Sequence, residues 1–190
     1  MNTQNQSREF EGSIFEFLFS LFDGHHIQSV LVGGYALIAN KVQRMTFDID
    51  FLITAEECAA IEPDLLKAGY SVFNRQDAFV QFKNERPGFR DLDFLIGDVH
   101  TKMQLISHGK QVTIAGKSFV VPSPLHLIAM KLHSISGNNK RELKDFPDIV
   151  QIMVANEIRV DDKDVVALFK KYHQMELYER VLKTIGAQHG

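Results

Sequence analysis

The pattern of apolar and polar residues changes along the chain. Up to about residue 121, short apolar runs bounded by glycine, proline or polar residues predict strands, and segments with helical apolar spacing separate them. After Ser123, a favourable helix N-cap followed by Pro124, only the helical pattern remains. The predicted strands are 27–32, 47–53, 71–73, 78–83, 91–96, 103–106 and a hairpin over 111–121. The predicted helices are 7–22, 35–40, 55–68, 124–136, 147–156, 163–173 and 175–185.

This order of elements predicts the fold class. We expect an α/β protein of the α+β type, in which a mixed β-sheet with helices is followed by a helical C-terminal region. The sheet region would comprise residues 1–122 and the helical region residues 123–190, packed together as one compact unit. A chain of 190 residues that is 45% hydrophobic is long and apolar enough to bury a full core.

Composition narrows the classes of protein that fit. The net charge of −3 argues against a uniformly basic surface, although it allows a local basic cluster. Cys58 is the only cysteine, so no internal disulfide can form. The chain has no run of 18 apolar residues, and its first residues are polar, so we expect neither a membrane span nor a secretory signal. These features predict a cytoplasmic protein with no membrane partner.

The stretch from Val30 to Phe51 carries the clearest chemical signal. It contains an apolar strand, the pair Gly33 and Gly34, a helical segment, and then Asp48 and Asp50 in a second apolar strand. Residues two apart on a strand share a face, so the two carboxylates would lie together, and a hard cation such as Mg²⁺ would offset their repulsion. The glycines let backbone amides approach an anion closely. Each part also occurs as an ordinary turn or strand end, but the combination favours a metal and phosphate site.

This stretch resembles the signature of the nucleotidyltransferase fold of the DNA polymerase beta superfamily. Val32, Gly33 and Gly34, followed by Asp48 and Asp50 after a spacer, match it. Arg44 and Thr46 extend the resemblance to the AbiEii-like abortive-infection nucleotidyltransferases, several of which are toxins of toxin–antitoxin pairs. Many of these relatives have serine where this chain has Gly34, so backbone amides would have to replace the hydroxyl contact to phosphate.

The resemblance implies a third carboxylate on a later strand. Asp91 and Asp93 both precede or enter the apolar run that ends at Ile96, and they share a face by the same periodicity. We favour Asp93 as the third metal ligand and general base because it leads directly into the apolar run. Asp91 remains an alternative, since position alone does not separate a base from a neighbouring salt-bridged carboxylate.

Two downstream segments complete the set of candidate site residues. In the relatives, a helix lysine at the place of Lys131 contacts the nucleotide phosphates. The resemblance gives Lys131 this nucleotide-binding role, together with Gly33, Gly34, Arg44 and Thr46. The alternative is that Lys131 has no such role and extends its apolar stem along the edge of the protein with its charge in solvent. The segment from Lys140 resembles a further motif of the same family. It adds Lys144 and Asp145 as site candidates and Asp148 as a weaker one, although acidic residues also simply favour the first turn of a helix.

The implied reaction is transfer of an NMP from an NTP to an acceptor hydroxyl, with residues 1–122 as the catalytic core. Asp48, Asp50 and Asp93 would hold Mg²⁺ or Mn²⁺. The resemblance suggests an RNA or tRNA acceptor, or a protein, and an antitoxin protein as partner. One alternative is a catalytically silent nucleotide- or partner-binding module on the same fold. Another is a phosphate-releasing metal hydrolase on an unrelated fold, which the absence of a P-loop sequence disfavours.

Overall fold

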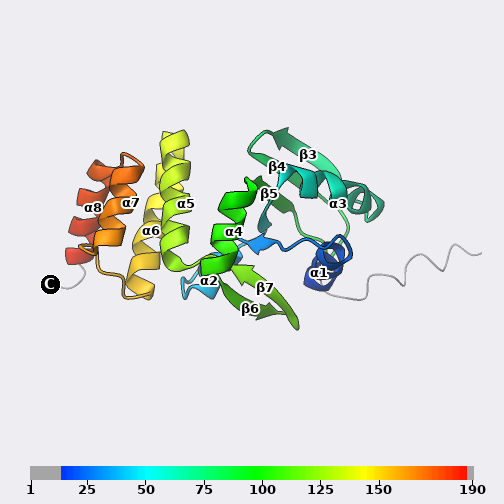
Figure 1. Cartoon of the computed structure of the whole chain (residues 1–190), viewed down its shortest axis with the longest axis horizontal. Coiled ribbons are helices and arrows are strands. Elements are labelled where there is room, and N and C mark those ends of the chain that lie inside the picture. The colour runs from blue at the N-terminus through cyan, green and yellow to red at the C-terminus, as the bar shows by residue number, and fades with distance from the viewer. Residues whose placement is uncertain (1–13, 188–190) are drawn as a thin grey trace, which may run out of the picture. The chain divides into compact units, whose positions relative to one another are not determined.

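The computed structural model describes residues 14–187, and these fall into two compact units. The first unit contains residues 14–33 and 46–121, and the second contains residues 34–45 and 122–187. All strands belong to the first unit, whereas the four long C-terminal helices belong to the second (Figure 1). The predicted fold class, a mixed sheet with helices followed by a helical region, is therefore confirmed.

The first unit is built on one mixed sheet of seven strands in the order β3-β4-β5-β2-β1-β7-β6. β2 pairs in parallel with β5, and β1 pairs in parallel with β7; the other neighbouring strands are antiparallel. The strands are β1 Val30–Leu31, β2 Ile49–Ile53, β3 Ser71–Gln76, β4 Phe79–Lys83, β5 Leu92–Ile96, β6 Lys110–Ile114 and β7 Lys117–Val121. β2 and β5 lie in the middle of the sheet, so a site built on them is supported from both sides.

Alternation along β2 and β5 divides the central sheet into an apolar face and an acidic face. Phe51 and Phe94 are register partners and are fully buried, and Phe22 of α1 (Ile14–Gly24) packs against both rings. The preceding residues on the two strands are Asp50 and Asp93, which are also register partners. Because successive strand residues point to opposite faces, burial of the phenylalanines directs these carboxylates to the other face. The remaining helices of this unit are α3 Ala55–Lys67 and α4 Val99–His108.

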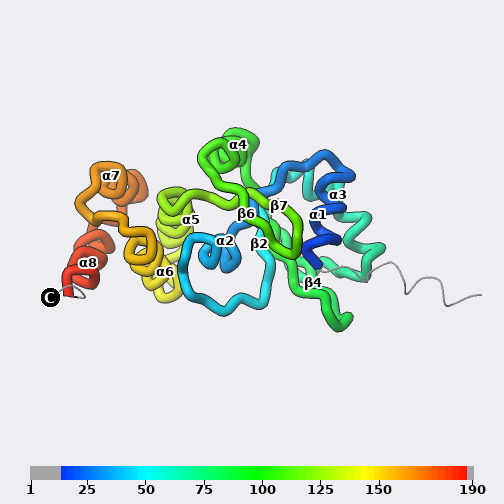
Figure 2. Tube along the Cα trace, turned by 90° about the horizontal axis from the view of Figure 1, so that it is seen from below, coloured from blue at the N-terminus to red at the C-terminus, as the bar shows by residue number. Residues whose placement is uncertain are grey.

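The second unit is a packed set of helices, which Figure 2 shows along the chain trace. Its long helices are α5 Pro124–Gly137, α6 Glu142–Ala155, α7 Lys163–Lys171 and α8 Met175–Gly186, and a short 3₁₀ turn spans Asn139–Arg141. α5 contacts α6 and α7, and α8 contacts α6 and α7. The buried Asn40 joins residues 34–45 to these helices: its side chain donates to the Pro122 carbonyl (3.1 Å), and its own carbonyl accepts from Asn156 (2.8 Å).

Two predicted elements need correction. The predicted strand 103–106 is wrong, because these residues lie inside helix α4, where the Asp98 side chain caps the first turn by accepting from the Thr101 N–H (2.8 Å). The predicted helix start at Pro147 is wrong as well, since α6 begins at Glu142 and contains Pro147. The short helix predicted at 35–40 is α2, Gly33–Ala39. Of the predicted helix 7–22, residues 7–13 lie outside the described residues.

The two units differ from the sequence-based division in one segment. The boundary near residue 122 is the same, but residues 34–45, which that division places in the first region, belong to the second unit. Within residues 14–187, no helix has both the length and the apolar character needed to cross a bilayer.

Candidate active site

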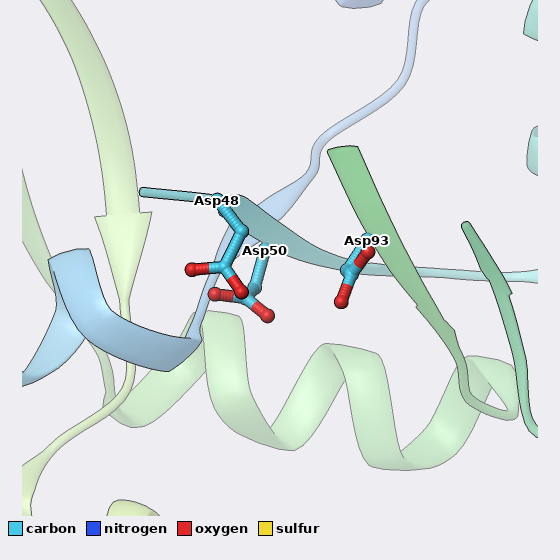
Figure 3. Close-up of side chains that lie close together, drawn as sticks. All are labelled: Asp48, Asp50 and Asp93. Atoms are coloured by element: carbon cyan, nitrogen blue, oxygen red, sulfur yellow. The ribbon is translucent and has the colours of Figure 1, made fainter. Parts of the chain in front are cut away.

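Three carboxylates meet on the acidic face of the sheet. Asp48, Asp50 and Asp93 each offer an oxygen, and these oxygens all lie within 4.8 Å of one another (Figure 3). Asp50 and Asp93 face each other across the parallel β2 and β5 pair, and Asp48 comes directly before β2, two residues from Asp50. All three are half-buried. The three carboxylates predicted from the sequence therefore lie together. The register of β2 with β5 places Asp50 beside Asp93, and the two-residue period of a strand places Asp48 on the same face as Asp50.

Gly33 lies directly against one of these carboxylates. A Cβ atom built on Gly33 would lie 1.9 Å from Oδ2 of Asp50, and the residue has a φ of +58°. Only glycine can adopt this backbone conformation without steric cost and also lie this close to the Asp50 carboxylate. The backbone of the strand before it is also tied to the site, because the Val32 N–H donates to the Asp50 carbonyl (2.9 Å). Gly34 follows as a buried residue of α2.

Neutral side chains hold two of the three carboxylates in place. The Thr46 hydroxyl donates to Oδ1 of Asp48 (2.9 Å), and the Gln81 amide on β4 donates to Oδ2 of Asp93 (3.0 Å). Asn74 on β3 donates in turn to the Gln81 side-chain oxygen (3.3 Å). Thr46 was a sequence candidate, whereas Gln81 and Asn74 were not. The only sequence signal for Gln81 is its polar position between the buried Val80 and Phe82, and that signal does not reveal its partner.

Asp91 occupies a different position from Asp93. The Ile49 N–H donates to the Asp91 carbonyl (3.0 Å), so Asp91 stands at the start of the β2–β5 ladder, and it is not a member of the acidic trio. The neighbouring Arg90 carbonyl accepts from the hydroxyl of Tyr70 (3.0 Å). Burial, and then the charge of Asp91, raise the pKa of the Tyr70 phenol, which keeps this donor protonated. The structure therefore brings Asp93, and not Asp91, together with Asp48 and Asp50, and the role of Asp93 as third metal ligand and general base stays a prediction.

The trio has the chemistry of a divalent metal site. Carboxylate oxygens are the ligands that Mg²⁺ and Mn²⁺ prefer, and three of them converge here without a histidine or cysteine. Three like charges this close repel one another unless a cation intervenes. Thr46 and Gln81 each donate one hydrogen bond to the group, which orients the carboxylates without neutralising them. The residues therefore fit an ion such as Mg²⁺ or Mn²⁺.

Metal binding is expected to stabilise the protein against heat. An ion at 100 times its dissociation constant contributes about 2.7 kcal/mol, or a rise in Tm of roughly 5–10 °C for a chain of this size. Asp50→Asn is expected to abolish the Mn²⁺-dependent rise and, because it removes one repelling charge, to melt no lower than wild type in chelator. Asp77→Asn, in the exposed β3–β4 turn, is the matched control and should keep the full rise. An equal rise in Asp50→Asn would place the ion elsewhere.

A second polar cluster, in the helical unit, gathers four of the other candidates. Lys131 Nζ lies 2.7 Å from carboxylate oxygens of both Asp145 and Asp148, and the guanidinium of Arg44 donates to both oxygens of Asp148 (2.8 and 2.7 Å). Arg141, which was not a site candidate, donates to Asp145 from Nε (3.1 Å). Both carboxylates are buried. Each is bound by one lysine and one arginine, which is the pairing that buried carboxylates require.

Lys144 does not join this cluster. It is exposed on α6, although Asp145 and Asp148 on the same helix are buried. The three site candidates of the segment thus separate into two that are buried in the unit and one that faces solvent. The nucleotide-binding roles of Arg44 and Lys131 remain predictions, because both side chains are engaged with aspartates here.

Comparison with solved structures shows which fold this chain has. The crystal structure of ANT(2″)-Ia in complex with adenylyl-2″-tobramycin is similar over 85% of this chain and 96% of that chain, with a TM-score of 0.61 and 16% identity. Lincomycin-bound lincosamide antibiotic adenylyltransferase LnuA is similar over 74% of this chain and 95% of that chain, with a TM-score of 0.52 and 14% identity. At these identities the likeness establishes the fold, which is that of a nucleotidyltransferase.

The family follows from the sequence itself. Residues 16–187 match the family described as Nucleotidyl transferase AbiEii toxin, Type IV TA system. Because this match spans almost the whole chain, the chain belongs to the AbiEii nucleotidyltransferase family, and it is a nucleotidyltransferase. The resemblance inferred from the segment between Gly33 and Asp50 is thereby confirmed. A comparison with curated proteins found no match.

Proposed function

We propose that the protein is a metal-dependent nucleotidyltransferase that transfers an NMP from an NTP to a hydroxyl of an RNA or tRNA acceptor, and that it acts as the toxin of a toxin–antitoxin pair. Transfer of an NMP follows from the family. The observation that supports metal dependence is the convergence of Asp48, Asp50 and Asp93 within 4.8 Å. The toxin role and the antitoxin partner rest on the family description, Type IV TA system.

The chain supplies the groups that such a transfer needs. An acceptor oxygen attacks the α-phosphorus, the bond from that phosphorus to the bridging oxygen breaks, and pyrophosphate leaves. Asp93, oriented by Gln81, would accept the proton of the attacking hydroxyl. A divalent ion held by the three aspartates would supply charge neutralisation and Lewis acidity toward the phosphate. Gly33 and Gly34 would offer backbone amides to the outer phosphates, which the close approach at Gly33 permits.

Lys131 and Arg44 would add positive charge toward the nucleotide phosphates. The Lys131 ammonium has three N–H donors, and two of them are directed at Asp145 and Asp148. The third would donate to a phosphate oxygen. Asp145 and Asp148 would then act by holding Lys131 and Arg44 in position. Lys144, which is exposed on α6, would contribute a positive charge from the protein surface.

The experiment is a transfer assay with each α-labelled NTP in turn, in Mg²⁺ or Mn²⁺, with total RNA and cell protein as acceptors. An aminoglycoside and a lincosamide form a third acceptor arm, because the similar structures include ANT(2″)-Ia with an adenylylated tobramycin and lincomycin-bound LnuA. Wild type is expected to label RNA, and Asp50→Asn to lose the label. Label on protein or antibiotic would change the acceptor. NTP binding without transfer would instead indicate the silent binding module, which the intact trio argues against.

A further inference from the structure

The acidic face of the sheet continues beyond the catalytic trio toward the β3 edge. Gln81 is the register partner of Asp93, so both side chains lie on one face, and Lys83 is two residues further along β4 on that same face. Lys83 is in turn the register partner of Ser71, the first residue of β3. A continuous polar surface therefore connects the trio with the outer strands of the sheet, entirely within the first unit.

A cavity of about 780 Å³ opens on this surface. Ser71, Phe73, Lys83 and Arg86 line it together with two carboxylates, Glu85 and Asp91. Its volume lies in the range of small-molecule and cofactor sites. Asp91 precedes Asp93 by two residues on the β5 ladder, a step of roughly 7 Å along a strand. The cavity is thus adjacent to the trio along the same strand.

A β-bulge turns an aromatic ring out onto this surface. The register of β3 and β4 shifts between Val72 and Asn74, which leaves Phe73 as the additional residue. Phe73 is 61% exposed, and Nζ of Lys83 lies 3.7 Å from the centroid of its ring. An exposed phenylalanine in a bulge contributes little to the core, whereas it provides a flat face on which another ring can stack.

The two cations of the cavity are available to an anion. Within residues 14–187, neither Lys83 nor Arg86 has a carboxylate oxygen within 4.0 Å of its side-chain nitrogens. The arginine of β3, Arg75, is by contrast paired with Glu62. Phosphate would complement Lys83 and Arg86, a base would complement Phe73, and the carboxylates of Glu85 and Asp91 would accept from ribose hydroxyls or exocyclic amino groups.

We propose that this cavity binds one nucleotide of the single-stranded end of an RNA acceptor, with its base stacked on Phe73 and its phosphate held by Lys83 and Arg86. A base must be unstacked to reach the ring, so a single strand fits and a duplex does not. The inference rests on the proposed function, because it specifies the acceptor of that reaction. The polar surface through Gln81 then leads from the bound nucleotide to Asp93, the group proposed to take the acceptor proton.

The test measures binding of a fluorescein-labelled ten-residue oligo(A) RNA by anisotropy, without NTP. Phe73→Ala is expected to weaken binding about 5- to 100-fold, as for loss of one stacked base, whereas Phe73→Tyr should stay within about 2-fold of wild type. The double variant Lys83→Gln with Arg86→Gln should weaken binding and reduce the salt-dependence slope by about 1.4. The matched control is Lys117→Gln, a lysine over Phe19 near the opposite edge of the sheet, which should leave binding unchanged.

The transfer assay, run on the same variants, separates this inference from the proposed function. Phe73→Ala should raise KM for RNA and leave KM for the NTP unchanged. If wild type transfers to RNA and Phe73→Ala does so with the same RNA KM, the cavity assignment is overturned and the function stands. If transfer is absent but oligo(A) binding depends on Phe73, the function fails and the cavity assignment stands. If wild type does not bind oligo(A) at all, or labels only protein, the assignment is overturned.

Discussion

Asp93→Asn is expected to lower kcat for nucleotidyl transfer by about 10³-fold or more, because it removes a metal ligand and the proposed proton acceptor together; a positioned base alone contributes 10²–10⁴-fold. The amide is close in shape to the carboxylate and can still meet Gln81 on β4, so the fold should persist. The measurement is single-turnover transfer with saturating NTP and acceptor. The Mn²⁺-dependent rise in Tm should disappear in the same variant.

Asp91→Asn should give a different kinetic signature. Asp91 stands at the start of the β2–β5 ladder and lines the cavity beside the trio rather than joining it. We expect it to raise the acceptor KM several-fold while the metal-dependent rise in Tm remains. Asp77→Asn, exposed in a turn, serves as the neutral control. The opposite result, with kcat and metal response lost in Asp91→Asn and kept in Asp93→Asn, would exchange the two assignments.

The sequence predicted the parts of this site that depend on local periodicity. Asp48 and Asp50 are two residues apart, and Asp93 leads into an apolar strand, so their placement on one face needed only the alternation of a strand. The side chains that orient them were not predictable in this way. Gln81 reaches Asp93 through the register of β4 with β5, and Arg44 reaches Asp148 across 104 residues of sequence. Register and helix docking arise from packing, which the local pattern does not contain.

The errors in the predicted elements have the same origin. The apolar residues near Leu105 suggested a strand, but the Asp98 cap and burial of Leu105 against the sheet favour a helix. Pro147 suggested a helix start, yet it lies within the first two turns of α6. The 3₁₀ turn Asn139–Arg141 comes directly before α6, so the chain is already helical when it reaches Pro147. Proline costs a helix one hydrogen bond, and burial of the apolar residues Ile149, Val150, Ile152 and Met153 later in α6 outweighs that loss.

Gly33→Ala is expected to lower the rate of transfer by about 10²-fold or more, chiefly because it displaces Asp50. The new Cβ would lie 1.9 Å from Oδ2 and 2.3 Å from Cγ of Asp50, so the carboxylate must leave its position in the trio. The left-handed conformation, φ +58°, adds a strain of about 1–2 kcal/mol. The variant should therefore lose both transfer and the Mn²⁺-dependent rise in Tm.

A second glycine separates displacement from strain. Gly116 in the β6–β7 turn has a φ of +74°, and a Cβ added there meets nothing within 4 Å. Gly116→Ala should therefore incur a comparable loss of stability, measured as a fall in Tm, while transfer and metal response stay at the wild-type level. If both alanine variants lose transfer equally, backbone strain rather than contact with Asp50 explains the requirement for glycine. If only Gly33→Ala loses it, the first glycine of the pair serves to leave space for the metal-binding carboxylate, a role distinct from any contact its amide makes with phosphate.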